Sequence, residues 1–165
     1  MRRRTITAAL FVLALVTGRA PVAGQTQNAT LNASINGLAR LSLSSAAITF
    51  PDADPDAVPS IQATQGPITL TAKARTSPNG RITLTVRAND HLRSGIDTIP
   101  ASNITWVASG AGFNNGTLSA ASAQIVAAWT GSGARSGTQT FFFKNLWSYA
   151  TGTYTLTMTY TLSAA

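Results

Sequence analysis

The sequence contains no cysteine and no glutamate, and its 165 residues include only five aspartates and one histidine. General acid–base catalysis, metal-assisted hydrolysis and nucleophilic triads depend on these residue types. Without cysteine no disulfide can stabilise the fold, so stability must come from burial and strand pairing. We therefore expect a protein that is not an enzyme and that has no catalytic, metal or cofactor site.

Positive charge is concentrated where the sequence begins. Three arginines at positions 2–4 precede the apolar run ITAALFVLALV, and small residues follow in TGRAPVAG. This order is typical of a secretory signal peptide, and an apolar run of 11 residues is too short to cross a bilayer. With cleavage after Gly24, residues 1–24 would be a signal peptide and residues 25–165 a single β-sandwich domain.

Removal of this leader would lower the net charge from +7 to +3, because four arginines leave with it. The remaining basic residues are scattered along the sequence, whereas nucleic-acid binding needs clustered Lys and Arg with interleaved aromatics. We expect a secreted protein, extracellular or at the cell surface, which would pass through the periplasm of a Gram-negative cell. It should have no nucleic-acid partner and no membrane span after cleavage.

Apolar and polar residues alternate along most of the remaining chain. The alternation is clearest in PITLTAKAR (67–75) and RITLTVRAN (81–89), which flank the turn TSPNG. Successive side chains of a strand point to opposite faces, so this period indicates strands with one buried face. The two segments are predicted to form a β-hairpin, with Asn79 and Gly80 as residues that tolerate positive φ.

Several other segments show the same period, and no segment has a helical one. The alternating segments are ATLNASI (29–35), LARLSLS (38–44), AITF (47–50), SNITWVAS (102–109), AQIVAAW (123–129), TQTFFFK (138–144) and TYTLTMTYTL (153–162). Short strands separated by polar turns predict an all-β fold, an antiparallel immunoglobulin-like β-sandwich of about eight or nine strands. Trp106 and Trp129 are expected in its core.

The segment PDADPDAVPS places Asp52, Asp54 and Asp56 at alternate positions, as at the start of a calcium-binding loop. An EF-hand loop would also need glycine at its sixth position and glutamate at its twelfth, where Ala57 and Ala63 stand. A solvated turn is the favoured interpretation, because Asp and Pro suit turns. Weak calcium binding stays open as the alternative.

Two aromatic residues, Trp147 and Tyr149, lie in the loop-like segment NLWSYATG. Exposed aromatics in a loop can form a sugar-binding platform or anchor an interface. The favoured interpretation is a hydrophobic plug that closes one end of the sandwich, and the platform or anchor stays open as the alternative.

The segment QTQNATLNASI (25–35) forms an arm that is apolar at Leu31, Ala33 and Ile35. Such an arm can be the first strand of its own domain. It can also act as a strand donor that adds to a neighbouring copy, where its alternate side chains would fill pockets. The Thr-rich segment 153–162 lacks the lysine or proline that usually protects an edge strand, so the fold or another subunit must cover it.

Three segments, 29–52, 67–88 and 136–162, together resemble bacterial pilin-like secreted domains of the spore coat protein U type. They are similar, in order, to the opening strands, the following hairpin and the closing strands of those domains. Such domains usually carry a cysteine pair near the first segments, and this sequence has no cysteine. A second resemblance is to WxL-type surface domains, through Gly152, Tyr154 and Leu162, with Tyr160 where those domains have tryptophan.

These resemblances imply an immunoglobulin-like sandwich that serves as a building or attachment unit at a bacterial surface. The leading hypothesis is a secreted, non-enzymatic structural, coat or pilus-like subunit that associates with itself or with related surface subunits, by strand addition. The alternative is a surface module that binds cell-wall or other polysaccharide through Trp147 and Tyr149.

Overall fold

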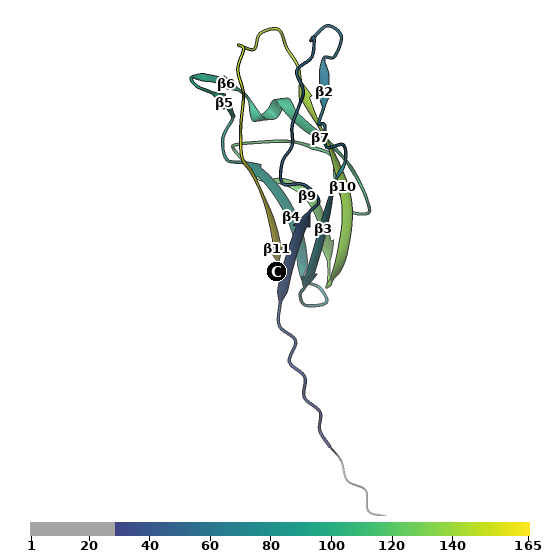
Figure 1. Ribbon diagram of the computed structural model, residues 1–165. Helices are drawn as coiled ribbons and strands as arrows, with labels where there is room; N and C mark the ends of the chain where they lie inside the picture. The colour runs from purple at the N-terminus through teal and green to yellow at the C-terminus, as the bar shows by residue number, and fades with distance from the viewer. Residues whose placement is uncertain (1–28) are drawn as a thin grey trace, which may run out of the picture. The chain divides into compact units, whose positions relative to one another are not determined.

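Eleven β-strands account for nearly all the regular structure of residues 29–165, the part of the chain that the computed structural model describes (Figure 1). The predicted signal peptide lies outside the described residues. Residues 34–165 form one compact unit, which contains every strand, and residues 29–33 belong to a separate unit. In the described part of the chain, no helix is long and apolar enough to span a membrane.

The strands are β1 (Leu38–Leu43), β2 (Ser60–Gln62), β3 (Ile68–Arg75), β4 (Arg81–Ala88), β5 (Leu92–Ser94), β6 (Asp97–Ile99), β7 (Ile104–Ser109), β8 (Gly116–Thr117), β9 (Gln124–Thr130), β10 (Gly133–Lys144) and β11 (Met158–Ala164). A single 3-10 turn, η1 (Ala101–Asn103), precedes β7. One sheet has the order β1-β3-β10-β7-β8, with β2 also paired to β10, and the other has the order β11-β4-β9. The strands β5 and β6 form a small separate hairpin.

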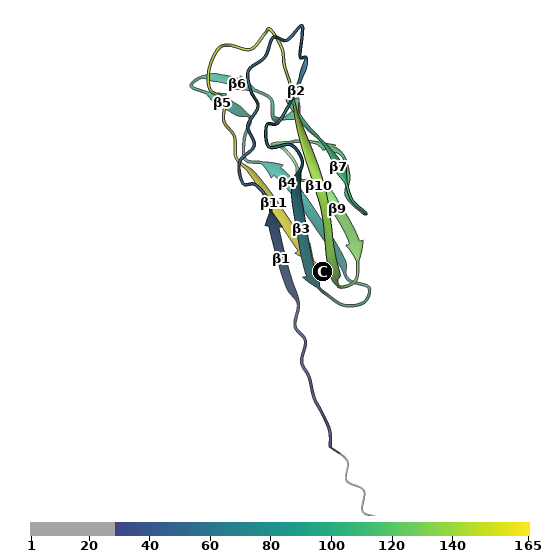
Figure 2. The same ribbon diagram turned by 45° about the vertical axis from the view of Figure 1, so that its right-hand side comes forward.

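All these pairings are antiparallel, and the two main sheets lie face to face (Figures 1 and 2). The prediction of an antiparallel all-β sandwich is therefore confirmed. The structure has more strands than predicted because β2, β5, β6 and β8 have only two or three residues each. Segments this short are too brief to show a period of two.

The core lies between the inward faces of the sheets. On β4, Ile82, Leu84 and Val86 are fully buried, and on the facing sheet Trp106 packs against Phe141 with 6.2 Å between ring centroids. Burial of each large apolar side chain contributes about 1.5–3 kcal/mol, so this row holds the sheets together without any disulfide. The expected core position of Trp106 is confirmed. Trp129 is half-buried and packs against the same core.

The predicted hairpin of residues 67–75 and 81–89 is wrong. Both segments are strands, but β3 pairs with β1 and β10, whereas β4 pairs with β11 and β9 in the opposite sheet. In a hairpin the two strands would lie side by side in one sheet. Here the connection between them crosses to the opposite sheet, as an arch, so that the apolar faces of β3 and β4 face each other across the core. Gly80 does not have positive φ. Glycine fits there because a Cβ atom would collide with Thr76 and Ala165.

Three further segments depart from the predicted strands. Residues 29–37 contain no strand, and β1 begins only at Leu38. Residues 47–50 are not a strand either, although Ile48 and Phe50 pack against the core. The final strand begins at Met158 rather than near 153, because the preceding residues follow β5 and pair with it only through the bridge between Thr155 and Arg93.

Candidate functional site

The arm that the sequence singles out has its apolar side chains in solvent. Leu31 is 96 % exposed and Ile35 is 76 % exposed, and Ala33 between them is exposed as well. Isolated exposed apolar residues are common on protein surfaces, but a regularly alternating exposed row is not. The structure therefore contains a strand-like apolar pattern that no strand pairing uses.

The strands β1 and β11 each form the edge of a sheet, and these two edges face each other. We call the space between the two edges the seam. The two strands approach each other, yet β1 pairs only with β3 and β11 pairs only with β4. One backbone edge of each strand is thus left without a ladder. An unpaired edge of this kind is a template for strand addition.

The side chains along the seam are only half-buried. Met158, Tyr160 and Leu162 of β11 point into the core, and they lie opposite Ala88, Val86 and Leu84 of β4. The β4 residues are 0 % exposed, whereas their β11 partners keep part of their surface in solvent. Since both rows belong to the same layer of the core, the difference arises because no strand of residues 29–165 pairs with β11 on its outer side.

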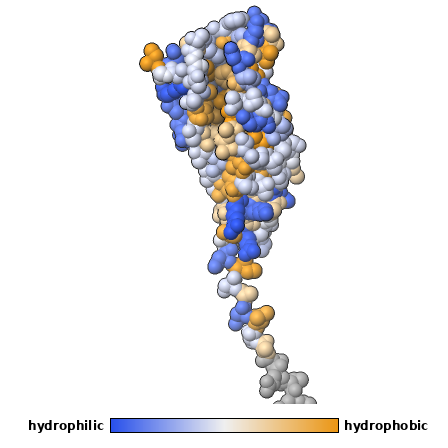
Figure 3. All heavy atoms as spheres, viewed as in Figure 1, coloured by the Kyte–Doolittle hydropathy of each residue, from blue (hydrophilic) through white to orange (hydrophobic). Residues whose placement is uncertain are grey.

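The apolar surface extends to both sides of the seam. Leu41 of β1 is half-buried on one side of the seam, and Tyr154 and Leu156, which lead into β11, are half-buried on the other. Figure 3 shows apolar side chains running along this face of the sandwich, in the hollow between the segments that enter β11 and leave β1. The seam is therefore an elongated apolar strip rather than a closed pocket.

A polar pair lies beneath the seam. The Tyr160 hydroxyl donates a hydrogen bond to Gln139 Oε1 on the facing sheet, at 2.5 Å. Gln139 is fully buried, and its Nε2 has no partner. Burial raises the pKa of the Tyr160 hydroxyl, so the group stays protonated and remains a donor at neutral pH. This bond joins the edge strand β11 to the centre of the opposite sheet.

The two aromatics of the NLWSYATG loop have different surroundings. Trp147 is 69 % exposed, and its Nε1 donates to a carboxylate oxygen of Asp56 at 3.1 Å. Tyr149 is half-buried, and its ring packs at a tilt against Phe143 with 5.6 Å between ring centroids. Its hydroxyl accepts a hydrogen bond from Asn103 and donates one to the Lys144 carbonyl. Burial raises the pKa of Tyr149. Tyr149 thus packs as a plug, and only Trp147 offers a free aromatic face.

The aspartates of the loop before β2 form a turn. Asp54 Oδ1 accepts from the backbone N–H of Asp56, and the Asp54 carbonyl accepts from those of Ala57 and Val58. Among residues 29–165, no three acidic or histidine side chains converge on one point. The described residues therefore provide no geometry for the calcium alternative, and the loop is organised by its own backbone.

The one ion pair among the described residues joins Arg93 to Asp90, at 2.6 Å. The hydrogen bond from Arg93, with a second from the His91 backbone, lowers the pKa of Asp90. The His91 ring accepts the N–H of Ala101 at 3.1 Å through Nδ1, which fixes the loop before β7. Arg93 also donates a hydrogen bond to the Thr98 hydroxyl at 3.4 Å, so these groups anchor loops.

A comparison of the chain with protein-family models finds no match, and a comparison with curated proteins finds none either. The features of the chain that point to a function are therefore the exposed apolar arm and the half-covered seam. The sequence pattern pointed to Leu31, Ala33 and Ile35. It also pointed to the unprotected segment 153–162, but it did not identify β1 as the strand that faces β11 across the seam.

Proposed function

We propose that this protein is a secreted, non-enzymatic structural subunit of a bacterial surface assembly, in which the arm of one copy adds as a strand to the seam of the next. The observation that carries this proposal is that one chain contains both an arm with an alternating apolar pattern that pairs with no strand and a seam whose apolar edge is not covered. We further assign the sandwich to the immunoglobulin-like class, with the seam at the place of a missing edge strand.

The dimensions of the arm support this pairing. Residues 29–37 are nine residues, which reach about 30 Å when extended, while the seven residues of β11 span about 23 Å. Leu31 and Ile35 are four residues apart, as are Met158 and Leu162. The arm can therefore follow the whole edge strand with its apolar side chains in step with the half-buried row.

The sizes of the side chains are also complementary. The middle residue of the arm is the small Ala33, and the middle residue of the β11 row is the bulky Tyr160. In the arm a small residue lies between two large ones, and in the β11 row the largest residue lies in the middle. The two rows can therefore interlock whichever way the arm runs. Close packing of this kind is what an interior requires.

Burial of Leu31 and Ile35 in the seam would contribute about 3–6 kcal/mol in total. Since each 1.4 kcal/mol is a factor of about ten in affinity, charging both positions should weaken association by two to four orders of magnitude. We expect residues 25–165 to form large, stable oligomers in light scattering. The double variant Leu31→Asp with Ile35→Asp should remain monomeric at the same concentration.

A matched control is available in the same segment. Asn32→Asp with Asn36→Asp adds the same charge at the same spacing, but on the other face of the extended arm. This control should assemble normally. A monomeric wild-type chain, or equal loss of assembly in both double variants, would show that the arm is not a strand donor.

A second candidate function is the binding of cell-wall or other polysaccharide. The observation that favours it is the exposed face of Trp147, whose orientation is held by Asp56. Retention of a monomeric protein on insoluble glycan, abolished by Trp147→Ala with an unchanged circular dichroism spectrum, would favour this candidate. Retention that survives Trp147→Ala would remove it.

A further inference from the structure

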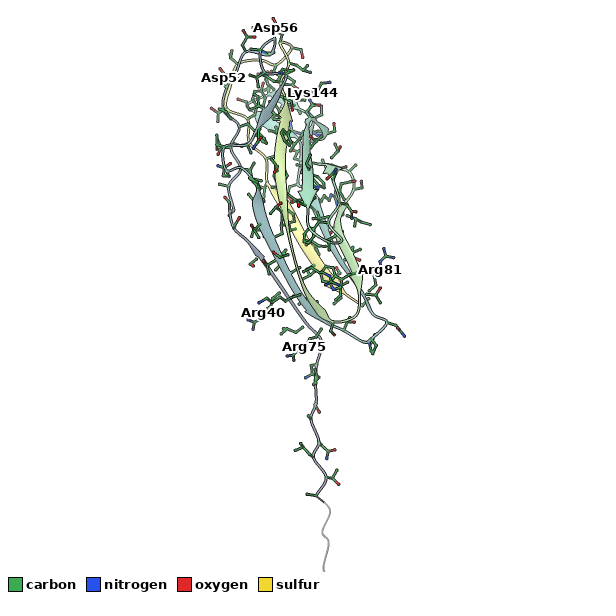
Figure 4. The ribbon with its side chains drawn as sticks, turned by 90° about the vertical axis from the view of Figure 1, so that its right-hand side faces the viewer. Arg40, Asp52, Asp56, Arg75, Arg81 and Lys144 are labelled. Carbon is green, nitrogen blue, oxygen red and sulfur yellow. The ribbon has the colours of Figure 1, made fainter. Side chains whose placement is uncertain are left out.

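Basic side chains that are scattered in the sequence gather at one end of the sandwich. The five residues are Arg40, Lys73, Arg75, Arg81 and Arg135, all exposed and all within three residues of a strand end. We call this set the basic end, and Figure 4 shows Arg40, Arg75 and Arg81 there. The basic end contains no aspartate.

Two of these residues face each other directly. Arg40 of β1 and Lys73 of β3 are register partners on the exposed face of the sheet, and Arg75 is the next outward residue along β3. Like charges in directly opposite positions of neighbouring strands are destabilising. None of the five forms an ion pair with any described residue. The basic end thus carries a cluster of positive charge without an ion pair to any described residue.

The aspartates occupy the opposite end. Asp52 and Asp56 lie at the far end of the sandwich in Figure 4, in the loop before β2 that also contains Asp54. Asp90 and Asp97 belong to the same end, because they follow the strand β4 that starts at Arg81 and runs away from the basic end. Three basic residues (Arg87, Arg93 and Lys144) accompany the five aspartates, which leaves that end net negative.

We propose that the basic end of one copy binds the Asp52–Asp56 loop of a second copy, so that copies join head to tail. This inference rests on the proposed strand addition and specifies its direction. The chain enters β1 at Leu38, whose register partner is Arg75. The arm therefore leaves the sandwich at the basic end, and the copy that receives the arm meets that end.

The surface of the basic end is suited to a protruding loop. A shallow hollow there is lined by Ile35, Gly37, Arg75, Ser77 and Ser132, among others. The acidic loop is a turn held by its own hydrogen bonds, and its three carboxylates are exposed. Opposite charges on the two surfaces would speed up encounter and set the orientation, which is how interfacial charge mainly acts.

Zero-length cross-linking can test this contact directly, because the chain has only two lysines, Lys73 and Lys144. A carbodiimide joins a lysine to a carboxylate only when they touch. In mixed ¹⁴N- and ¹⁵N-labelled wild-type protein, we expect intermolecular cross-links between Lys73 and the Asp52–Asp56 loop. Lys144, at the acidic end (Figure 4), should form no link to the Asp52–Asp56 loop of another copy and serves as the internal control.

A charge-reversal pair provides the matched variants. Lys73→Glu and Lys144→Glu change the net charge equally, but only Lys73→Glu should slow assembly, by about tenfold in 20 mM NaCl and less than about twofold in 0.5 M NaCl. Lys73→Glu should also raise the urea midpoint of unfolding, because it turns the repulsive pair with Arg40 into an attractive one. Loss of assembly together with loss of stability would contradict the assignment.

Mixing complementary variants separates docking from general charge effects. Lys73→Glu with Arg75→Glu should assemble poorly alone, as should Asp52→Lys with Asp56→Lys, and an equimolar mixture should recover the wild-type rate. Normal assembly of all these variants would overturn head-to-tail docking while strand addition stands.

The cross-linking is repeated in the Leu31→Asp, Ile35→Asp variant in 20 mM NaCl. Links from Lys73 to the loop there support docking even if strand addition fails, and their absence from both proteins overturns it.

Discussion

The hydrogen bond between Tyr160 and Gln139 allows a quantitative test of the structure itself. The Gln139 amide is fully buried, its Nε2 has no partner, and Tyr160 provides the hydrogen bond to its Oε1. Tyr160→Phe would remove that partner and leave the buried oxygen unsatisfied. The cost of an unsatisfied buried acceptor is about 1–3 kcal/mol.

The reverse change should behave differently. Gln139→Leu removes the amide together with its unpaired Nε2 and leaves the Tyr160 hydroxyl as the only group of the pair without its partner. We expect Gln139→Leu to cost less than Tyr160→Phe, and the double variant to be more stable than Tyr160→Phe alone. Replacing both partners by apolar groups is often nearly neutral.

The assay is urea denaturation of the four proteins in the non-assembling Leu31→Asp, Ile35→Asp background, so that unfolding does not depend on concentration. A common slope with shifted midpoints would show that only native-state stability has changed. The expected coupling energy between the two positions is about 1–3 kcal/mol. If Tyr160→Phe unfolds at the wild-type midpoint, the pair is not isolated from solvent, and the description of the core beneath the seam is wrong.

Two further predictions concern packing and charge. Gly116→Ala should destabilise the fold by about 1–3 kcal/mol, since its Cβ would overlap the Trp106 ring, whereas the strand control Gly133→Ala meets no atom and should stay within about 0.5 kcal/mol of wild type. Equal midpoints for the two variants would refute this packing. Asp90→Asn should lower stability at pH 7, because Arg93 lowers the pKa of Asp90 in the folded state. That contribution is present above the unfolded pKa of about 3.9 and is lost as pH falls through the lowered folded pKa, so the two unfolding curves should converge there. A difference that persists in acid would exclude the ion pair as its source.

The local pattern predicted the strands well and their partners poorly. In β3 and β4 the alternation correctly identified which residues face inward, from Ile68 to Ala88. It could not show whether the two strands lie in one sheet or in opposite sheets, because a buried face satisfies either arrangement. That choice depends on distant strands such as β10 and β11, which no local pattern contains.

The same limit applies to the candidate site. The apolar period of the arm was visible at Leu31 and Ile35, because it depends only on neighbouring residues. The basic end was not visible, since Arg40, Lys73 and Arg135 are far apart in the sequence and come together only through the pairing of β1, β3 and β10. For the seam, the sequence indicated that segment 153–162 lacks edge protection, but not that β1 would face it, because that neighbour is set by the fold.

The crossing arches between the sheets have a consequence for how the chain folds. From β3 to β4, from β9 to β10 and from β10 to β11, each step along the chain crosses from one sheet to the other. The residues at the first arch are held by Ala165, through Thr76 Oγ1 and the Arg81 carbonyl. Folding dominated by such long-range pairing is slow, in the range of milliseconds to seconds. Because β3 pairs with β10 and β4 pairs with β11, neither main sheet can be completed until the last two strands are available.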